Sequence, residues 1–155
     1  MTNTENNRNK ATAITKILND AVYLDSECYP NYYSIGFLCQ GKRKYYEIRG
    51  NGSFTRQQIQ EIKLILAEYV TIGFNSKEYD IPLLRVALTG ISTSLIKKAS
   101  DKLINKPRGT FAWKLLKDAK IPYCDTKLHI DLFEVAPGVG VSLKTYAARM
   151  GFRKI

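Results

Sequence analysis

The sequence predicts an α/β fold built on a mixed sheet, in which an antiparallel three-strand meander is joined to parallel strands and flanked by helices. Three strand-like segments with short connections open the chain, and from residue 53 onward helical and strand-like segments alternate. Short connections favour antiparallel neighbours, whereas strand–helix–strand alternation favours parallel ones. A chain of 155 residues is the size of one domain.

The meander is indicated by segments rich in β-branched and aromatic residues. Turn residues, Pro30-Asn31 and Gln40-Gly41, separate these segments. The three strands are expected over residues 21–27, 32–40 and 42–50.

The rest of the chain shows helical spacing interrupted by short apolar runs. In the first helix Ile62 and Leu66 recur at helical spacing, and either Ser53 or Thr55 can cap it. In the second, Pro82 suits the first turn and Gly90 the end. Helices are expected over residues 53–69, 79–90, 92–105, 110–120 and 142–150, and further strands over residues 70–76 and 127–137.

The charge balance indicates a polyanionic partner. The chain holds 24 Lys and Arg against 14 Asp and Glu, a net charge of +10. Such an excess favours nucleic acid first and an anionic membrane surface second. It is concentrated between residues 92 and 120, which we expect to contact phosphates unless these helices are simply solvated. The predicted nucleic-acid-binding residues there are Lys97, Lys98, Lys102, Lys106 and Arg108.

Cysteine usage and hydropathy favour a protein of a reducing compartment. Cys28, Cys39 and Cys124 fit neither a disulfide framework nor a metal knuckle. No apolar run approaches the roughly 20 residues of a membrane span, and the opening segment lacks the apolar centre of a signal peptide. We therefore expect no membrane partner, a flexible polar tail at residues 1–12 and a single domain at residues 13–155.

Two carboxylates, Asp25 and Glu27, interrupt the first predicted strand. Residues two apart on a strand point to the same face, so the two acids are expected side by side with Ser26 on the other face. Carboxylates this close repel one another unless a proton or a cation intervenes. Oxygen ligands suit Mg²⁺ or Mn²⁺, which makes the pair a candidate metal site. The alternative is a strand end whose acids face water.

A third acid, Asp80, follows the strand expected at residues 70–76, near the carboxyl end where α/β sheets gather their ligands. If that strand lies beside the first one, Asp80 can complete a three-carboxylate pocket. Asn75, at the strand exit, is placed to hydrogen-bond a sugar or a phosphate. The alternative for Asp80 is a favourable position against the dipole of its own helix.

The residues "LDSE" at 24–27, followed by "GFNSKEYD" at 73–80, resemble the first two exonuclease motifs of the DEDD 3′-to-5′ exonucleases. In the proofreading domains of DNA polymerases the second motif is commonly Asn, three residues, an aromatic residue and Asp. Asn75, Tyr79 and Asp80 match it. The segment "HIDLFEVAPGVGVSLKTYAARMG", residues 129–151, resembles the stretch before the third motif in phage-type DNA polymerases. The resemblance spans about residues 23–155.

This resemblance implies a ribonuclease H-like fold and a metal-dependent 3′-to-5′ exonuclease, a hydrolase that proofreads for a DNA polymerase in replication. It implies two Mg²⁺ or Mn²⁺ ions, with Asp25 bridging both, Glu27 ligating the ion that holds the nucleophilic water, and Asp80 supporting the other. Asn75 and Tyr79 would contact nucleic acid. The implied partners are a single-stranded DNA 3′ end and a polymerase domain of the same longer chain, in the cytoplasm of a bacterium or phage-infected cell.

The sequence departs from the family at its third motif, a Tyr or His followed at four or five residues by Asp, which has no match after Gly138. We therefore expect this chain to lack the C-terminal motif and to be weak or inactive alone. The alternative is that Asp131 or Glu134 substitutes for the fourth carboxylate.

Several other residues have simpler expected roles. His129 is expected to make a structural hydrogen bond rather than act as a general base. Trp113 is expected to anchor its helix by packing. Tyr29, Tyr32 and Tyr33 can stack on an unpaired base, although two of the three are expected to be core or strand-surface residues.

Two other functions remain open on the sequence. One is a non-catalytic nucleic-acid-binding module on a ribonuclease H-like fold, which would use the basic segment and the tyrosines. The other is a basic structural or interaction domain whose acids lie on the surface without a ligand.

Overall fold

The structure, a computed structural model, describes residues 15–16, 18–135, 141–149 and 151. The predicted tail at residues 1–12 lies outside the described residues, as do residues 136–140 and 150 of the segment that resembles phage polymerases.

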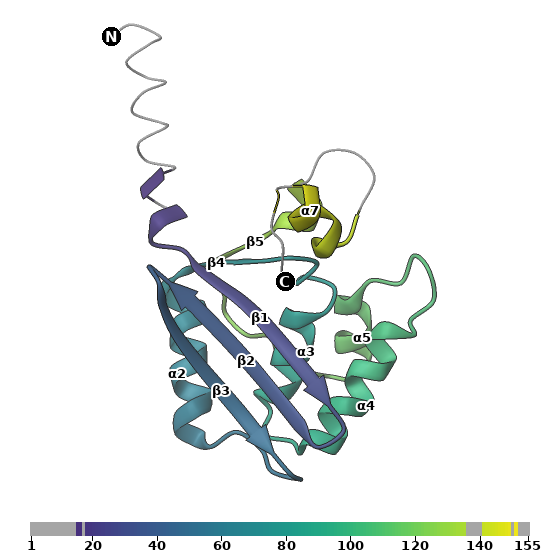
Figure 1. The fold of residues 1–155 in the computed structure, drawn as a ribbon. Helices are drawn as coiled ribbons and strands as arrows, with labels where there is room; N and C mark the ends of the chain where they lie inside the picture. Colours follow the sequence, from purple (N-terminus) through teal and green to yellow (C-terminus); the bar gives the residue numbers. More distant parts are fainter. Residues whose placement is uncertain (1–14, 17, 136–140, 150, 152–155) are drawn as a thin grey trace, which may run out of the picture.

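The described strands form one mixed sheet in the order β3-β2-β1-β4-β5 (Figure 1). β1, β2 and β3 are an antiparallel meander, and β4 and β5 extend it in parallel from β1. This confirms the predicted α/β class with antiparallel and parallel strands. The strands are β1 (Val22–Tyr29), β2 (Tyr32–Cys39), β3 (Lys42–Arg49), β4 (Val70–Gly73) and β5 (Leu128–Asp131).

The helices agree with the prediction except near residue 131. The strand expected over residues 127–137 ends at Asp131, where the chain turns into a short helix. The Asp131 carboxylate accepts the Phe133 N–H at 3.0 Å and so caps that turn. The helices are α2 (Arg56–Glu68), α3 (Asp80–Ala87), α4 (Thr93–Ile104), α5 (Ala112–Asp118), α6 (Leu132–Val135) and α7 (Leu143–Arg149).

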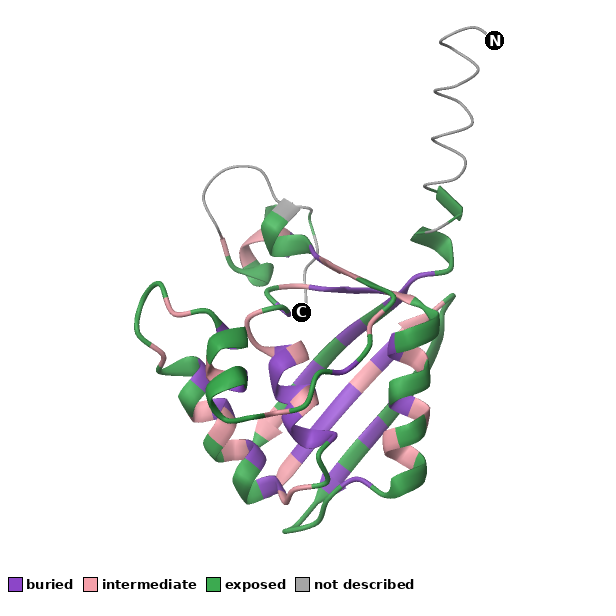
Figure 2. Ribbon diagram, turned by 180° about the vertical axis from the view of Figure 1, so that it is seen from behind, coloured by how far each residue is buried: buried purple, intermediate pink, exposed green. Residues whose placement is uncertain are grey.

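The meander has a covered face and an open face. Along β1, Val22, Leu24 and Ser26 are buried, whereas Tyr23 and Asp25 between them are exposed. The helices α2, α3 and α4 lie over the covered face, and Figure 1 looks onto the opposite face of β1–β3. Figure 2 shows the buried residues of the strands from the helical side. The core is therefore the layer between sheet and helices.

The core is apolar and closely shared between the two layers. Fully buried residues come from both, with Tyr33 and Ile35 on β2, Ile62 and Leu66 on α2, and Leu83 on α3. Burying side chains of this size contributes about 1.5–3 kcal/mol each. Since α3 begins at Asp80, this packing also places that carboxylate against β1.

Within the described residues, every helix falls short of the length and apolar character that crossing a bilayer requires.

The capping box of α2 provides a test of local stability. Thr55 accepts the Gln58 N–H at 3.2 Å, and the Gln58 side chain accepts the Thr55 N–H at 2.9 Å. We expect Thr55→Ala to lower the free energy of unfolding by about 1 kcal/mol. Thr55→Ser keeps the hydroxyl acceptor and should retain most of it. Urea denaturation measures both, and equal losses would show that the hydroxyl does not cap.

Candidate active site around Ser26

Asp25 and Glu27 lie side by side on the open face of β1, as the strand period predicts. The neighbouring Tyr29 hydroxyl donates to Glu27 Oε2 at 3.2 Å. Partial desolvation raises the pKa of Asp25, and the charge of Glu27 raises it further, while the Ser26 N–H opposes both. The pair therefore carries the mutual repulsion that a bound cation would relieve.

Asp80, the first residue of α3, reaches the same point of β1 from the other side. Its Oδ1 accepts the Ser26 N–H at 3.0 Å and the Ser26 Oγ–H at 2.5 Å. Burial raises the pKa of Asp80 to about 6, and the charge of Asp25 adds to this, although both Ser26 hydrogen bonds oppose the shift. The charge of Asp25 thus acts on Asp80 across the strand.

The contact between Asp80 and Ser26 arises because β1 and β4 pair over a short length. Their register runs through Val22↔Thr71 and Tyr23↔Ile72, and β4 ends at Gly73. Past this point the edge of β1 faces the start of α3, and Asp80 takes the Ser26 N–H that a longer β4 would have paired. The pairing of β1 with β4 therefore ends beside the contact between Asp80 and Ser26.

The three acids of the predicted pocket, Asp25, Glu27 and Asp80, lie around Ser26. Asp25 and Glu27 point to the open face, whereas Asp80 is buried and approaches from the helical side, because α3 packs on the covered face. The donor set is all oxygen and suits Mg²⁺ or Mn²⁺. Among the described residues, however, no three His, Cys, Asp or Glu side chains are grouped to hold one ion.

The loop that carries Asp80 is fixed by His129 on β5. His129 Nε2 lies 2.7 Å from Ser76 Oγ, and its Nδ1 lies 2.9 Å from Thr71 Oγ1. Burial lowers the pKa of His129, which favours the neutral ring, and a hydroxyl can serve either ring nitrogen as donor or acceptor. The expected structural role of His129 is confirmed.

Gly73 lets this loop turn tightly off β4. A Cβ at Gly73 would lie 2.4 Å from Ser76 Oγ and 2.5 Å from Ser76 Cβ. Ser76, which is fully buried, therefore folds back over the end of β4, where it meets His129. Only a residue without a side chain permits this approach.

Asp131 holds the same loop from the end of β5. It is buried, and its carboxylate accepts the N–H groups of Asn75 at 2.7 Å and Lys77 at 2.9 Å. Glu134 pairs with Lys77 at 2.5 Å. Asp131 is therefore engaged by the backbone of this loop, and Glu134 is engaged by Lys77. The sequence signal for Asp131 was its position at the end of an apolar strand.

The two other residues of the second motif differ in access. Asn75 is exposed and has a left-handed backbone (φ 53°), so its side chain stands outside the loop that its N–H anchors. Tyr79 is half-buried against the core, and its hydroxyl lies 2.8 Å from Ser100 Oγ on α4. Asn75 remains available to a ligand, whereas the hydroxyl of Tyr79 is already engaged.

Two predicted phosphate-binding lysines are already paired with acids. Lys97 binds Asp101 one turn along α4, and Lys106 lies 3.1 Å from Glu78. These contacts reduce the positive charge that either lysine offers to a phosphate.

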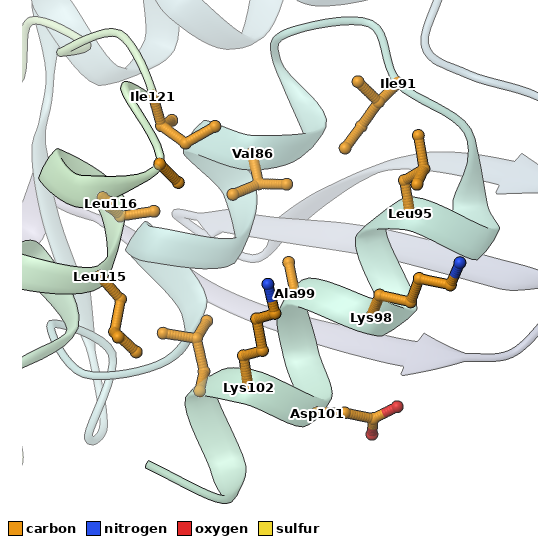
Figure 3. A pocket seen from close by; sticks show the side chains of 12 residues that line it. Val86, Ile91, Leu95, Lys98, Ala99, Asp101, Lys102, Leu115, Leu116 and Ile121 are labelled. Atoms are coloured by element: carbon orange, nitrogen blue, oxygen red, sulfur yellow. The ribbon is translucent and has the colours of Figure 1, made fainter. Parts of the chain in front are cut away.

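Lys98 and Lys102 line an apolar groove between α3, α4 and α5, with a volume of about 480 Å³ (Figure 3). Leu95 and Ala99 of the same helix line it too. Arg108 is exposed in the loop before α5. The predicted basic lobe is therefore partly an apolar groove with a cationic edge.

The aromatic residues divide between core and surface. Tyr33 is completely buried, and its hydroxyl has no hydrogen-bond partner within the described residues. Tyr29 is exposed, and its ring lies 6.2 Å from the ring of Tyr32. Trp113 is 58% exposed, so the expectation that it anchors its helix is wrong.

Comparison of the chain with protein-family models, curated proteins and solved structures gave no match. The case for a function therefore depends on the residues around Ser26.

The role assigned to Asp131 can be measured by stability. Asp131→Ala leaves three part-buried N–H groups without their acceptor, so we expect the free energy of unfolding to fall by about 2–4 kcal/mol. Glu134→Ala removes only an exposed ion pair and should cost at most about 1 kcal/mol. Chemical denaturation compares the two, and similar losses would argue against a structural role for Asp131.

The burial of Asp80 predicts a pH dependence of stability. The folded protein keeps the Asp80 proton up to pH about 6, whereas an ordinary carboxyl releases it near 3.8. Ionisation therefore disfavours the folded state as the pH rises between these values. Relative to the wild type, we expect the free energy of unfolding of Asp80→Asn to rise by up to ~3 kcal/mol between about pH 4 and pH 6.5. A constant difference across this range would contradict the raised pKa.

Proposed function

We propose that this chain is a metal-dependent nuclease domain with a ribonuclease H-like fold that acts as a 3′-to-5′ exonuclease on DNA. The observation that carries the proposal is the contact of Asp80 with Ser26, which lies between Asp25 and Glu27 on β1, at the place where the pairing of β1 with β4 ends. The mixed sheet, with a meander beside parallel strands, supports the proposed fold. The resemblance of residues 24–27 and 73–80 to exonuclease motifs supports the reaction.

Asp25, Glu27 and Asp80 would hold Mg²⁺ or Mn²⁺. Bound divalent ions activate water as a nucleophile and stabilise the leaving oxygen of a phosphodiester. The chain's own contribution is negative charge at a fixed place, with Asp25 and Glu27 on the open face and Ser26 orienting Asp80. Because the pKa of Asp80 is about 6, its protonation at lower pH would weaken the site.

The proposed partner is the 3′ end of single-stranded DNA, presented by a polymerase domain of a longer chain. The net charge of +10 supports binding to a polyanion. Exposed Asn75, close along the chain to Asp80, is a candidate contact to the sugar or phosphate.

A non-catalytic nucleic-acid-binding module is the second candidate. It is favoured by the net charge of +10, which suits a polyanion whether or not the chain cleaves it. Such a module would bind DNA in chelator and would not cleave it.

Asp25→Ala tests the catalytic proposal. In an active longer form of the chain that carries the third motif, we expect cleavage of a 5′-labelled single-stranded oligonucleotide with Mn²⁺ to fall about 10²–10⁴-fold, which corresponds to roughly 3–5 kcal/mol of transition-state stabilisation. Asp118→Ala is the matched control, because it removes an exposed carboxylate on α5. Calorimetric titration with Mn²⁺ provides a readout that does not require activity.

An unchanged cleavage rate in Asp25→Ala would rule out the assigned role. Salt-sensitive DNA binding that persists in chelator, without cleavage by the wild type, would support the non-catalytic module.

A further inference from the structure

The open face of the meander holds a hollow beside the acid pair. It has a volume of about 400 Å³, within the usual range for sites of small ligands. Asp25 and Glu27 form one side of it and β3 the other. The hollow is also lined by Tyr23, Gly36, Arg43 and Tyr45.

The strand register arranges these residues in rows across the face. Asp25 pairs with Gly36, which pairs with Tyr45, so the three form one row across β1, β2 and β3. In the next row Tyr23 on β1 pairs with Leu38 on β2, and Leu38 pairs with Arg43 on β3. Residues in register on one face are close neighbours. An aromatic ring and a guanidinium thus stand opposite the acids.

Gly36 allows the Tyr45 ring to lie over the sheet. A Cβ at Gly36 would lie 2.8 Å from Cε1 and 3.1 Å from Cδ1 of Tyr45, so the ring covers the place where any other side chain would stand. The side chain of Tyr45 is nevertheless 64% exposed. A large ring held in place by the backbone beneath it and still exposed to solvent is a ready stacking surface.

The charges of the hollow suit a phosphate-bearing ligand. Arg49, further along β3, is bound to Glu47 at 2.9 Å. Within the described residues no ion pair involves Arg43, which leaves its guanidinium for an anion. Guanidinium groups recognise phosphate oxygens through paired hydrogen bonds. The ring can stack on a base and the guanidinium can pair with a phosphate, while the two carboxylates can accept hydrogen bonds from sugar hydroxyls or base N–H groups.

We propose that this hollow binds one unpaired nucleotide of a single-stranded nucleic acid, with its base stacked on Tyr45 and an adjoining phosphate at Arg43. The assignment rests on the proposed function, since it places a phosphodiester beside Asp25 and Glu27. A base held in a duplex is stacked on both faces and is not free to lie on Tyr45. The hollow therefore selects single strands.

Binding of a 5′-fluorescein oligothymidylate, followed by fluorescence anisotropy, tests the proposal without cleavage. The titration is made in chelator and again with Ca²⁺. We expect Tyr45→Ala to weaken binding roughly 5- to 150-fold, the range for loss of one base–aromatic stack. Tyr45→Phe keeps the ring and should bind as the wild type does.

Tyr123→Ala is the matched control for a lost exposed tyrosine. Tyr123 is 75% exposed and lies beside Arg85, so it offers the same ring and cation outside the open face. We expect no change in binding of the oligothymidylate to this variant.

Gly36→Ala gives a second, independent variant that removes no aromatic group. Its new methyl displaces the Tyr45 ring, so binding should weaken although every side chain of the hollow is retained. In the Tyr45→Ala background the same substitution should have no further effect on binding. This non-additivity identifies the ring as the cause.

The outcomes separate this inference from the proposed function. Equal binding by the wild type and Tyr45→Ala, with Mn²⁺-dependent cleavage intact, would overturn the nucleotide site and leave the exonuclease standing. Loss of binding in Tyr45→Ala, with no cleavage or Mn²⁺ binding by the wild type, would support the site and overturn the exonuclease.

Two further results would also overturn the nucleotide site. One is equal affinity for a blunt duplex. The other is self-association of the protein that Tyr45→Ala abolishes, since that result would make the open face an interface between copies of the chain.

Discussion

The bond between the Asp80 carboxylate and Ser26 joins the helical layer to the strand on which the candidate site depends. It satisfies a backbone N–H at the place where β4 no longer pairs with β1, and it fixes the first residue of α3. Without an acceptor there, a buried N–H would cost about 1–3 kcal/mol. The same bond holds the Asp80 carboxylate near the charge of Asp25. One side chain therefore satisfies the backbone of β1 and also has a raised pKa.

Two buried aspartates near the site illustrate how surroundings decide the role of a carboxylate. Asp131 accepts backbone N–H groups from Asn75, Lys77 and Phe133, and these donors compensate for its burial. Burial raises the pKa of Asp80 to about 6 and the charge of Asp25 adds to this, although the hydrogen bonds that it accepts from Ser26 oppose the shift. Asp131 therefore anchors a loop, whereas the negative charge of Asp80 is poorly compensated and a nearby cation would stabilise it.

The open face gives the acids a surface on which a substrate could lie. On the covered face the side chains of β1 meet helices, while on the open face Asp25, Gly36 and Tyr45 form a row in contact with solvent. Gly36 shapes the open face, because its missing side chain lets a ring of β3 lie across β2 toward β1. An α/β sheet with one open face thus combines two carboxylates and an exposed aromatic ring within one small hollow.

By itself the sequence determined what depends on short-range periodicity. The strands and most helices followed from alternation, helical spacing and caps, and the two-residue period placed Asp25 and Glu27 on one face. The end of β5 at Asp131 was missed, because the helix that follows depends on a cap that alternation does not reveal. The packing of Trp113 was predicted wrongly, because the sequence does not show which side of a helix packs against another element.

Only the tertiary structure decided how distant segments meet. It placed Asp80 on the covered side of β1 through the packing of α3, and it assigned Asp131 and His129 to the loop that carries Asp80. It also brought Tyr45 over Gly36 beside the acids. These contacts join residues far apart in the chain, and their geometry depends on strand register and helix packing, which local sequence does not encode.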